Sequence, residues 1–566
     1  MIYPVPRFLT CGDAALLVEV ADEIGSTANS RVRGLDAALG AAQISGIIET
    51  VPAYCLLLVE YDPLVLSYGD LKEHLAKLFQ KIDHVSQPEA PLKLVPTVYG
   101  DEIGPDLADV AAAHNLTPQE VIALHSGTIY TVYMLGFSPG FAYMGQVPES
   151  IATPRLAEPR TRVPAGSVAI AGRQTGVYPQ STPGGWRLLG RTNISLFDPN
   201  REPACFFQPG DRVQFVPVHA DEIAPAEETQ HDDEPAADNP SIEVIAPGLL
   251  TTVQDAGRIG YQRFGVPVSG AMDSFALCAA NALVGNPPGA AALEITVAGP
   301  TLRFLSDALI AITGADLHPV LRTPEMDAWD APLWTALYVR RGSRLDASAG
   351  ARRTGCRAYL AIAGGIATTP VMKSRGTYLA GGFGGYRGRA LEAGDLLATG
   401  APRGHLPSLA GRALPPNRCP RYSDSPTVRV VLGPQDDYFK PETIQTLLSQ
   451  EYAVSGTSDR MGLRLQGAPL EHRGAAEIIS NGIALGAIQV PPNAQPIILT
   501  ADHQTAGGYP VIATIIRADM PLLAQCVPGQ SRVRFTAVSV EEAQSICRAA
   551  ASRWQPEESV PDAVAF

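Results

Sequence analysis

The hydrophobic residues of this chain come in short runs, most of them ended by glycine or proline. Two such runs near the N-terminus, residues 13–20 and 46–63, have the character of strands and alternate with two stretches of helical spacing. The apolar positions of those stretches lie three or four residues apart: Val32, Leu35 and Leu39 in the first, and Leu71, Leu75, Leu78 and Ile82 in the second. The alternation predicts a small N-terminal α/β sandwich over residues 1–88.

A proline-flanked break at residues 87–91 separates the first segment from a region with a different pattern of apolar residues. Thr117 and Glu120 form a capping-box pattern with Pro118 between them, so a helix is predicted from there to about His125. Short apolar runs separated by turn residues follow as far as residue 218. Regular turn spacing of this kind predicts a closed or sandwiched β unit over residues 89–218.

Residues 219–241 contain many acidic, Ala and Pro residues, with Ile223 as the one large aliphatic residue. A segment of this composition buries too little apolar surface to offset its ordering entropy, so it is predicted to be a flexible acidic tether. Beyond it, residues 242–550 show strand runs and one helix, predicted to start near 269–271 and to stop before Gly285. We expect two β subdomains there, and a mainly β fold with α+β parts for the whole chain.

One detail suggests that the two halves share a β design. A Pro-Gly turn precedes a short strand pattern at Pro209 and again at Pro528. The tether predicts two modules joined by a spacer, with function at the surface where they meet.

Composition narrows the function classes. A formal net charge of −14 argues against a nucleic-acid or anionic-membrane surface. The eight cysteines show no C-x-x-C spacing, which is typical of reduced core cysteines. No stretch has the apolar length of a membrane span, and a cytoplasmic protein is predicted.

Several stretches match known functional motifs in part but lack residues that those motifs need. Residues 136–140, GFSPG, have the letters of a serine nucleophile elbow, but Pro139 cannot supply the backbone N–H that such an elbow uses for its oxyanion hole. Met372-Lys373 lacks the flanking residues of a biotin-attachment hairpin, so no covalent biotin is expected. The glycine-rich residues 380–389 either wrap an anion or form a surface turn, and the turn is favoured. Histidine spacing gives no metal site.

Three clusters of polar residues lie among glycines and prolines, where backbone can approach a small ligand closely. The first cluster contains His125, Phe137, Pro139, Gly140, Arg162, Gln174, Thr175, Trp186 and Arg187. The second cluster contains Gln254, Asp255, Arg258, Ser269, Asp273 and Glu294. The third cluster contains Arg460, Gln489, Asp502, Gln504, Thr505 and Tyr509.

Arginines beside carboxylates suit a carboxylate-bearing or amide-like small substrate. Among the cluster residues, His125 is a candidate acid–base group, and the candidate bases are Asp255, Asp273, Glu294 and Asp502. Each also has a structural interpretation: Asp255 can cap a turn, Glu294 can pair with an arginine, and His125 can end a helix.

Two long stretches resemble a known pair of families. Residues 10–218, with GFSPGFAYMG at 136–145 and TPGGWRLLGRT at 182–192, resemble the allophanate hydrolase subunit 1 family, which includes the B-type subunit of bacterial 5-oxoprolinase. Residues 242–540, with TVQDAGRIGYQRFGVPVSGAMDS at 252–274 and ADHQTAGGYP at 501–510, resemble the subunit 2 family, which includes the C-type subunit of the same enzyme. The chain is identified as a fusion of the two.

The resemblance implies cyclophilin-like β-barrel domains in both halves. It also implies a separate partner, the A-type subunit of 5-oxoprolinase, and ATP, with magnesium, as cofactor for opening the lactam of 5-oxo-L-proline to L-glutamate. Phosphorylating the lactam oxygen would make a better electrophile, and Arg162, Arg187 and Arg258 are predicted to clamp a carboxylate or phosphate. The tether would hold the B-like and C-like parts together at high effective concentration.

Two other functions are compatible with the same resemblance. The same pair of folds forms the carboxyltransferase domain of urea carboxylase, which moves a carboxyl group from biotin to urea, so a biotin carrier would be the partner. Related proteins have also been described as a sporulation-kinase inhibitor and its antagonist, which would make this chain a regulatory binding protein. Further self-association into a homo-oligomer is expected in any of these cases.

Overall fold

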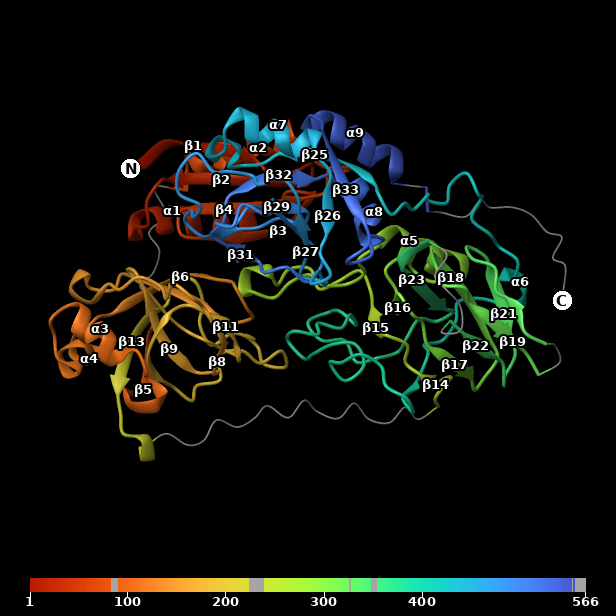
Figure 1. Ribbon diagram of the computed structural model, residues 1–566, viewed down its shortest axis with the longest axis horizontal. Helices are drawn as coiled ribbons and strands as arrows, with labels where there is room; N and C mark the ends of the chain where they lie inside the picture. Colours follow the sequence, from red (N-terminus) through yellow and green to blue (C-terminus); the bar gives the residue numbers. More distant parts are fainter. Residues whose placement is uncertain (83–89, 223–238, 325–326, 348–353, 552, 555–566) are drawn as a thin grey trace.

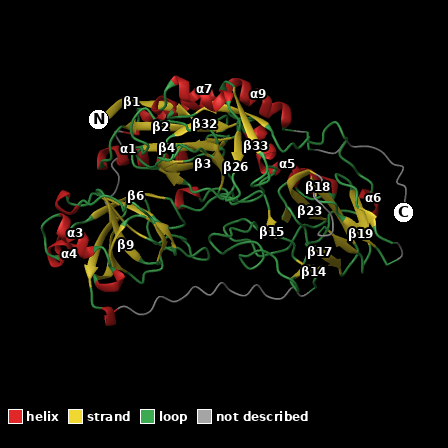
Figure 2. Cartoon of the chain, viewed as in Figure 1, coloured by secondary structure: helices red, strands yellow, loops and turns green. Residues whose placement is uncertain are grey.

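The computed structural model describes residues 1–82, 90–222, 239–324, 327–347, 354–551 and 553–554. These residues form mainly β structure, with a four-stranded N-terminal sheet, a closed seven-stranded barrel in each half and a body of two larger sheets (Figure 1, Figure 2). The predicted mainly β fold with α+β parts is confirmed at this level. Most of the predicted tether, residues 223–238, lies outside the described residues.

The N-terminal sheet is antiparallel, with the strand order β1-β2-β4-β3. Its strands are β1 (Ile2–Thr10), β2 (Ala15–Ala21), β3 (Ile47–Pro52) and β4 (Leu56–Tyr61), and its helices are α1 (Ser26–Ala42) and α2 (Tyr68–Phe79). α1 buries Val32, Leu35 and Leu39, the stripe that the sequence predicts. α2 starts after Ser67, whose side chain accepts a hydrogen bond from the backbone of Asp70.

The first barrel has the strand order β10-β7-β6-β13-β5-β12-β9. Its strands are β5 (Leu92–Tyr99), β6 (Tyr130–Leu135), β7 (Ala142–Gly145), β9 (Ser167–Ala171), β10 (Gln174–Val177), β12 (Arg187–Arg191) and β13 (Arg212–Pro217), accompanied by the hairpin β8 (Arg160–Val163) and β11 (Thr182–Gly184). The helices α3 (Leu107–Ala113) and α4 (Pro118–Ser126) cover one end. The capping box of Thr117 and Glu120 is present at the start of α4, as predicted.

The middle of the chain forms two sheets and the helix α5 (Ser274–Leu283). The six-stranded sheet contains β14 (Ile242–Ala246), β17 (Thr301–Phe304), β19 (Val320–Arg322), β20 (Trp329–Asp330), β22 (Arg344–Asp346) and β24 (Leu396–Leu397). The five-stranded sheet contains β15 (Leu250–Gln254), β16 (Ala292–Thr296), β18 (Ala308–Asp316), β21 (Ala336–Val339) and β23 (Thr354–Ile362). A short helix, α6 (Leu406–Leu409), precedes the crossing to the second barrel.

The second barrel has the strand order β25-β32-β29-β30-β27-β26-β33. Its strands are β25 (Thr427–Leu432), β26 (Tyr452–Val454), β27 (Gly462–Gln466), β29 (Ala487–Gln489), β30 (Ile497–Leu499), β32 (Val511–Ile515) and β33 (Arg532–Ala537), with the small pair β28 (Asn481–Gly482) and β31 (Ala506–Gly507) beside them. Its helices are α7 (Pro441–Ser449), α8 (Met520–Ala524) and α9 (Val540–Ala550). Each barrel contains one parallel pair, β5 with β13 and β25 with β33. β13 and β33 follow the two Pro-Gly turns, so the shared design indicated by the sequence is confirmed.

The two halves are interlocked rather than merely tethered. The N-terminal sheet lies against the second barrel, so the first and last parts of the chain are side by side (Figure 1). The backbone N–H of Arg517 donates to Asp13 Oδ1 at 2.9 Å, and the amide of Gln544 lies 2.9 Å from the Tyr61 hydroxyl. Apolar side chains of both halves share one core at this contact. The fusion therefore folds as a single assembly.

Candidate functional site

Parts of the three polar clusters predicted from the sequence meet at one place. Gly136, which precedes Phe137 of the first cluster, lies close to Ala506, which follows Thr505 of the third. A Cβ on Gly136 would stand 2.5 Å from the Ala506 Cβ. The carbonyl of Ser138 similarly abuts Gly265, which adjoins the second cluster. The backbone N–H of Ser269 donates to the carbonyl of Ala501 at 3.0 Å. Loops from both barrels and from the two-sheet body therefore converge.

Arg460 joins the second and third clusters through two buried carboxylates. Its Nη1 lies 2.5 Å from Glu294 Oε1, and its Nε and Nη2 lie 3.0 and 2.9 Å from the oxygens of Asp502. Burial raises the pKa of Glu294, but the guanidiniums of Arg460 and Arg357 outweigh it and hold that pKa below its usual value. Glu294 also accepts hydrogen bonds from the Met272 backbone and the Tyr359 hydroxyl. This network is a structural tie between two bodies, and it leaves Glu294 a weak base.

The remaining candidate carboxylates are also engaged by neighbouring groups. Asp273 caps α5 by accepting from the Ala276 backbone at 2.9 Å, and it accepts from Tyr422 and Gln525 at 2.8 Å each. Burial raises the pKa of Asp273 to about 6, within the range of a general base or acid near neutral pH. Asp255 accepts from the backbone of Gly257 and Arg375 and from the Ser374 hydroxyl, so it shapes the loop that carries Arg258.

Arg258 is the exception, because most of its donors have no partner among the described residues. Its side chain is fully buried, and its Nη2 donates to the carbonyl of Gly376, while no hydrogen-bond partner of Nε or Nη1 lies within the parts of the chain that the structure describes. The guanidinium carbon lies 5.0 Å from the centre of the Phe383 ring. Burial lowers the pKa of Arg258. Because buried polar groups in proteins are nearly always paired, an open guanidinium of this kind indicates a site for a polar or anionic molecule.

Four more buried polar atoms on or beside the converging loops also lack a partner among the residues that the structure describes. They are Ser138 Oγ, Gln254 Oε1, Ser269 Oγ and Thr505 Oγ1. Together with Arg258 these residues are called the junction site below.

Phe383 belongs to the glycine-rich residues 380–389, which the sequence predicted as a surface turn. Its side chain is buried and packs against the guanidinium of Arg258, so the prediction was wrong for this part of the loop.

His125 lies in the core of the first barrel, away from the junction site. It is fully buried, with Nδ1 2.8 Å from the Tyr99 hydroxyl and Nε2 3.0 Å from the Thr175 hydroxyl. Burial lowers the pKa of His125 to about 3, so the imidazole is neutral. These contacts do not favour the predicted acid–base role, and they also explain Thr175, which completes the same buried chain.

The predicted clamp of three arginines is not assembled. Arg162 is exposed on β8 and donates to Ser181, while Arg187 donates to the carbonyl of Pro154. No contact among the described residues joins either of them to Arg258. The structure therefore does not bring the three arginines together, and the binding role of each stays a prediction.

The other predicted residues have packing or backbone contacts. Phe137 and Trp186 belong to an aromatic group around Phe141. Pro139 adjoins Gly140, whose N–H donates to the carbonyl of Phe264. Gln489 donates to the carbonyl of Tyr509, and the Gln504 amide lies near Gly507. Gln174 faces a different space, described next.

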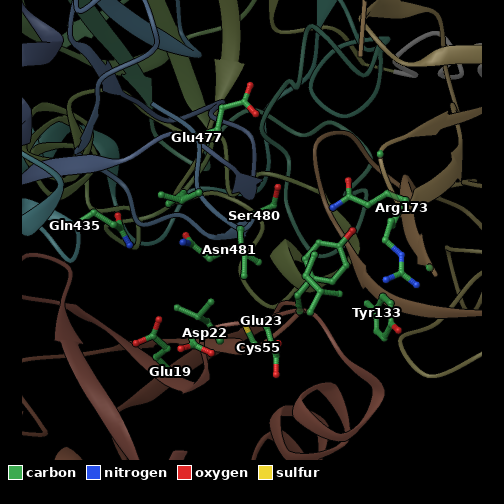
Figure 3. Close-up of a pocket in the computed structure, with 18 of the residues that line it drawn as sticks. Glu19, Asp22, Glu23, Cys55, Tyr133, Arg173, Gln435, Glu477, Ser480 and Asn481 are labelled. Carbon is green, nitrogen blue, oxygen red and sulfur yellow. The ribbon is translucent and has the colours of Figure 1, made fainter. Parts of the chain in front are cut away.

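A large cavity lies where the N-terminal sheet and the two barrels meet (Figure 3). Its volume is about 1150 Å³, and its walls include Glu19, Asp22, Glu23, Tyr54, Tyr133, Arg155, Arg173, Gln174, Gln435, Asp437, Glu477, Ser480 and Asn481. Of the residues predicted from the sequence only Gln174 lines it. Apart from Gln174, the sequence analysis did not single out the residues of this cavity, because they are scattered over short segments of the N-terminal sheet and of both barrels. We refer to it as the interdomain cavity.

Within the parts of the chain that the structure describes, no group of three or more His, Cys, Asp and Glu residues is arranged to hold a metal ion. The helices among those residues include none with both the length and the apolar character needed to cross a membrane.

Comparison with known proteins agrees with this geometry. The family described as carboxyltransferase domain, subdomain A and B, matches residues 264–537, and carboxyltransferase domain, subdomain C and D, matches residues 6–207. The C-type 5-oxoprolinase subunit of Escherichia coli is 40% identical over 310 residues, which are 53% of this chain and 93% of that protein. The B-type 5-oxoprolinase subunit of Bacillus subtilis is 39% identical over 221 residues, which are 37% of this chain and 90% of that protein.

The chain is also similar to one solved structure and to one longer protein. The crystal structure of TTHA0988 superposes with a TM-score of 0.80 at 34% identity, covering 92% of this chain and 99% of that one. Urea amidolyase of Lachancea kluyveri is 36% identical over 326 residues, which are 54% of this chain but 17% of that protein. The fused B-like and C-like arrangement therefore has a counterpart of nearly the same extent.

Proposed function

Because the chain belongs to the carboxyltransferase-domain family that contains the B-type and C-type subunits of 5-oxoprolinase, we propose that it is the fused B–C component of an ATP-dependent 5-oxoprolinase. In this proposal it activates 5-oxo-L-proline for ring opening to L-glutamate and works with a separate protein of the A type. The two closed barrels are proposed to be cyclophilin-like domains, with domain limits near residues 88, 218 and 242.

The observation that carries the proposal is the open guanidinium of Arg258 in a fully buried setting. 5-Oxoproline is a small lactam with one carboxylate, and the unpaired Nε–H and Nη1–H groups of Arg258 are each proposed to donate a charge-assisted hydrogen bond to a polar or anionic group of the substrate. Ser138, Gln254, Ser269 and Thr505 supply unpaired hydroxyl and amide groups for the polar lactam. Exclusion of water at such depth strengthens each of these hydrogen bonds.

The stability of the lactam amide determines which chemical step the enzyme must assist. A planar amide resists attack at its carbonyl carbon, so the ring must be activated before water can open it. Asp273 has a raised pKa and is proposed to move a proton near neutral pH; Glu294 and Asp502, held by Arg460, are proposed to fix the junction site in place.

ATP with magnesium is part of the proposal, but the residues of this chain do not fit a triphosphate by themselves. A triphosphate needs several convergent cationic or N–H donors. At the junction site Arg460 and Arg357 already face Glu294, which leaves Arg258 as the available cation. The interdomain cavity contains Arg155 and Arg173 but a larger number of carboxylates. We therefore propose that the nucleotide site is completed by the A-type partner.

The test is reconstitution. Purified chain is mixed with an A-type 5-oxoprolinase protein, 5-oxoproline, ATP and magnesium, and L-glutamate and ADP are measured with each component omitted in turn. Glutamate formation is expected only in the complete mixture, and Arg258→Met is expected to lower it about 100-fold or more, since two charge-assisted hydrogen bonds are lost. Undiminished glutamate formation without this chain would overturn the proposal.

A second candidate function is favoured by the urea amidolyase similarity. The chain would then transfer a carboxyl group between a biotin carried on another protein and urea or a related amide. The same junction site would hold the amide. Carboxylation of urea with a biotinylated carrier, together with no glutamate formation in the complete reconstitution mixture, would favour this second function.

A further inference from the structure

Opposite charges face one another across the interdomain cavity. Arg155 and Arg173 come from the first barrel, and Asp437 and Glu477 come from the second barrel body. Figure 3 shows Arg173 and Glu477 on different sides of the space. All four side chains are exposed, and the Arg173 Nη2 donates to the Gln146 amide oxygen at 2.7 Å. Among the described residues no ion pair joins these arginines to these carboxylates.

Neutral polar groups lie between the charged walls. Asn481, on β28, and Ser480, beside it, lie between Gln435 and Arg173 in Figure 3. Gln174, the first residue of β10, follows Arg173 and also lines the cavity. The part of the cavity between the barrels therefore has a cationic side, a neutral middle and an anionic side. The N-terminal sheet adds a mixed set of charges, Arg7, Glu19, Asp22 and Glu23, and residues such as Leu56 and Ile479 supply apolar surface. A ligand that satisfies both sides and the middle must carry both a positive and a negative group.

We propose that the interdomain cavity binds a free amino acid of the ring-opened type. Its carboxylates would meet Arg155 and Arg173, and its ammonium would meet Asp437 and Glu477. The proposal rests on the function proposed above and extends it, since it assigns the product a site distinct from the junction site.

Ring opening itself creates the group that this cavity would recognise. Water adds its oxygen to the lactam carbonyl carbon, the C–N bond breaks, and the nitrogen takes up a proton. The lactam nitrogen is an uncharged amide, whereas the released amine is an ammonium at neutral pH, and a second carboxylate appears. The anionic wall can therefore separate product from substrate by charge alone. The volume of about 1150 Å³ leaves room for water beside such a molecule.

The experiment is equilibrium binding to the full chain by titration calorimetry, without ATP or a partner. L-Glutamate is expected to bind, and Arg173→Gln and Glu477→Gln are each expected to weaken it about 10-fold. The matched controls Arg548→Gln and Glu541→Gln, exposed positions on α9, are expected to change nothing. Binding of 5-oxoproline should be unaffected by all four substitutions.

A second ligand separates recognition of the ammonium from general anion binding. N-Acetyl-L-glutamate keeps both carboxylates but has no ammonium, so it is expected to bind at least 10-fold more weakly than glutamate. Equal binding of the two ligands would overturn the inference, as would no binding of glutamate, or glutamate binding that survives both substitutions. Equal loss of 5-oxoproline binding in the two variants would also overturn it, because the cavity would then be the substrate site. None of these results depends on turnover, so failure of the proposed activity would be seen separately.

Discussion

Replacing Arg258 by Met should make the ligand-free protein more stable while removing substrate binding. Arg258 is fully buried, and desolvating an ion at such depth costs several kcal/mol. Against this stand one charge-assisted hydrogen bond to Gly376, contributing about 1.5–3 kcal/mol, and a contact with the Phe383 ring, contributing about 0.5–2 kcal/mol. The lowered pKa of Arg258 indicates that the burial cost is the larger effect.

Methionine fills a comparable volume and packs well against an aromatic ring, so Arg258→Met should leave little cavity. We expect the free energy of unfolding to rise by about 1–2 kcal/mol, measured from urea midpoints without ligand. Added 5-oxoproline should stabilise the native sequence and not the variant. A variant destabilised by more than about 1 kcal/mol, and still stabilised by 5-oxoproline, would refute the reasoning.

Three further predictions concern buried charge. Arg460→Met should cost about 3–5 kcal/mol in urea unfolding because it strands Glu294 and Asp502, and a cost below about 1 kcal/mol would contradict the structural role of the network. Burial raises the pKa of Glu60 to about 7, so the folded state holds the Glu60 proton more tightly than the unfolded state, and the stability of the fold should fall as pH rises from about 5 to 8. Glu60→Gln should remove this pH dependence of the thermal unfolding temperature. An unchanged pH dependence would show that another group causes it. Burial lowers the pKa of His125 to about 3, so stability should fall as pH drops below about 6.5, and the ring resonances should not titrate between about pH 8 and 5; titration in that range would show an accessible imidazole.

Local patterns were sufficient for most of the fold. The apolar spacing around Leu35 predicted α1, and the capping box at Thr117 predicted the start of α4. α5 begins at Ser274, a few residues after the predicted start, because Asp273 supplies the cap and the preceding glycine-rich turn is not helical. What the pattern missed is the pairing of the first segment of the chain with the last barrel, since strand periodicity carries no information about which bodies meet.

The candidate site, too, could be predicted from the sequence only in part. Glycine and proline around polar residues marked the loops that converge at the junction site, because close backbone approach needs those residues there. The burial and hydrogen bonding of these side chains could not be predicted from the sequence. His125 and Arg258 were both candidate functional residues, but the ring nitrogens of His125 are hydrogen-bonded, whereas Arg258 has unpaired donors among the described residues. Arg155 and Asp437 carried no local signal, because their opposition arises only when the barrels pack together.

The most direct test of the account is the affinity of 5-oxo-L-proline for the full chain and for the Arg258→Met and Arg162→Met variants. If the buried guanidinium binds the substrate carboxylate, calorimetry should show binding to the native chain and to Arg162→Met, and a loss of about 100-fold or more in Arg258→Met. Equal affinity in all three proteins would contradict the assignment of the junction site.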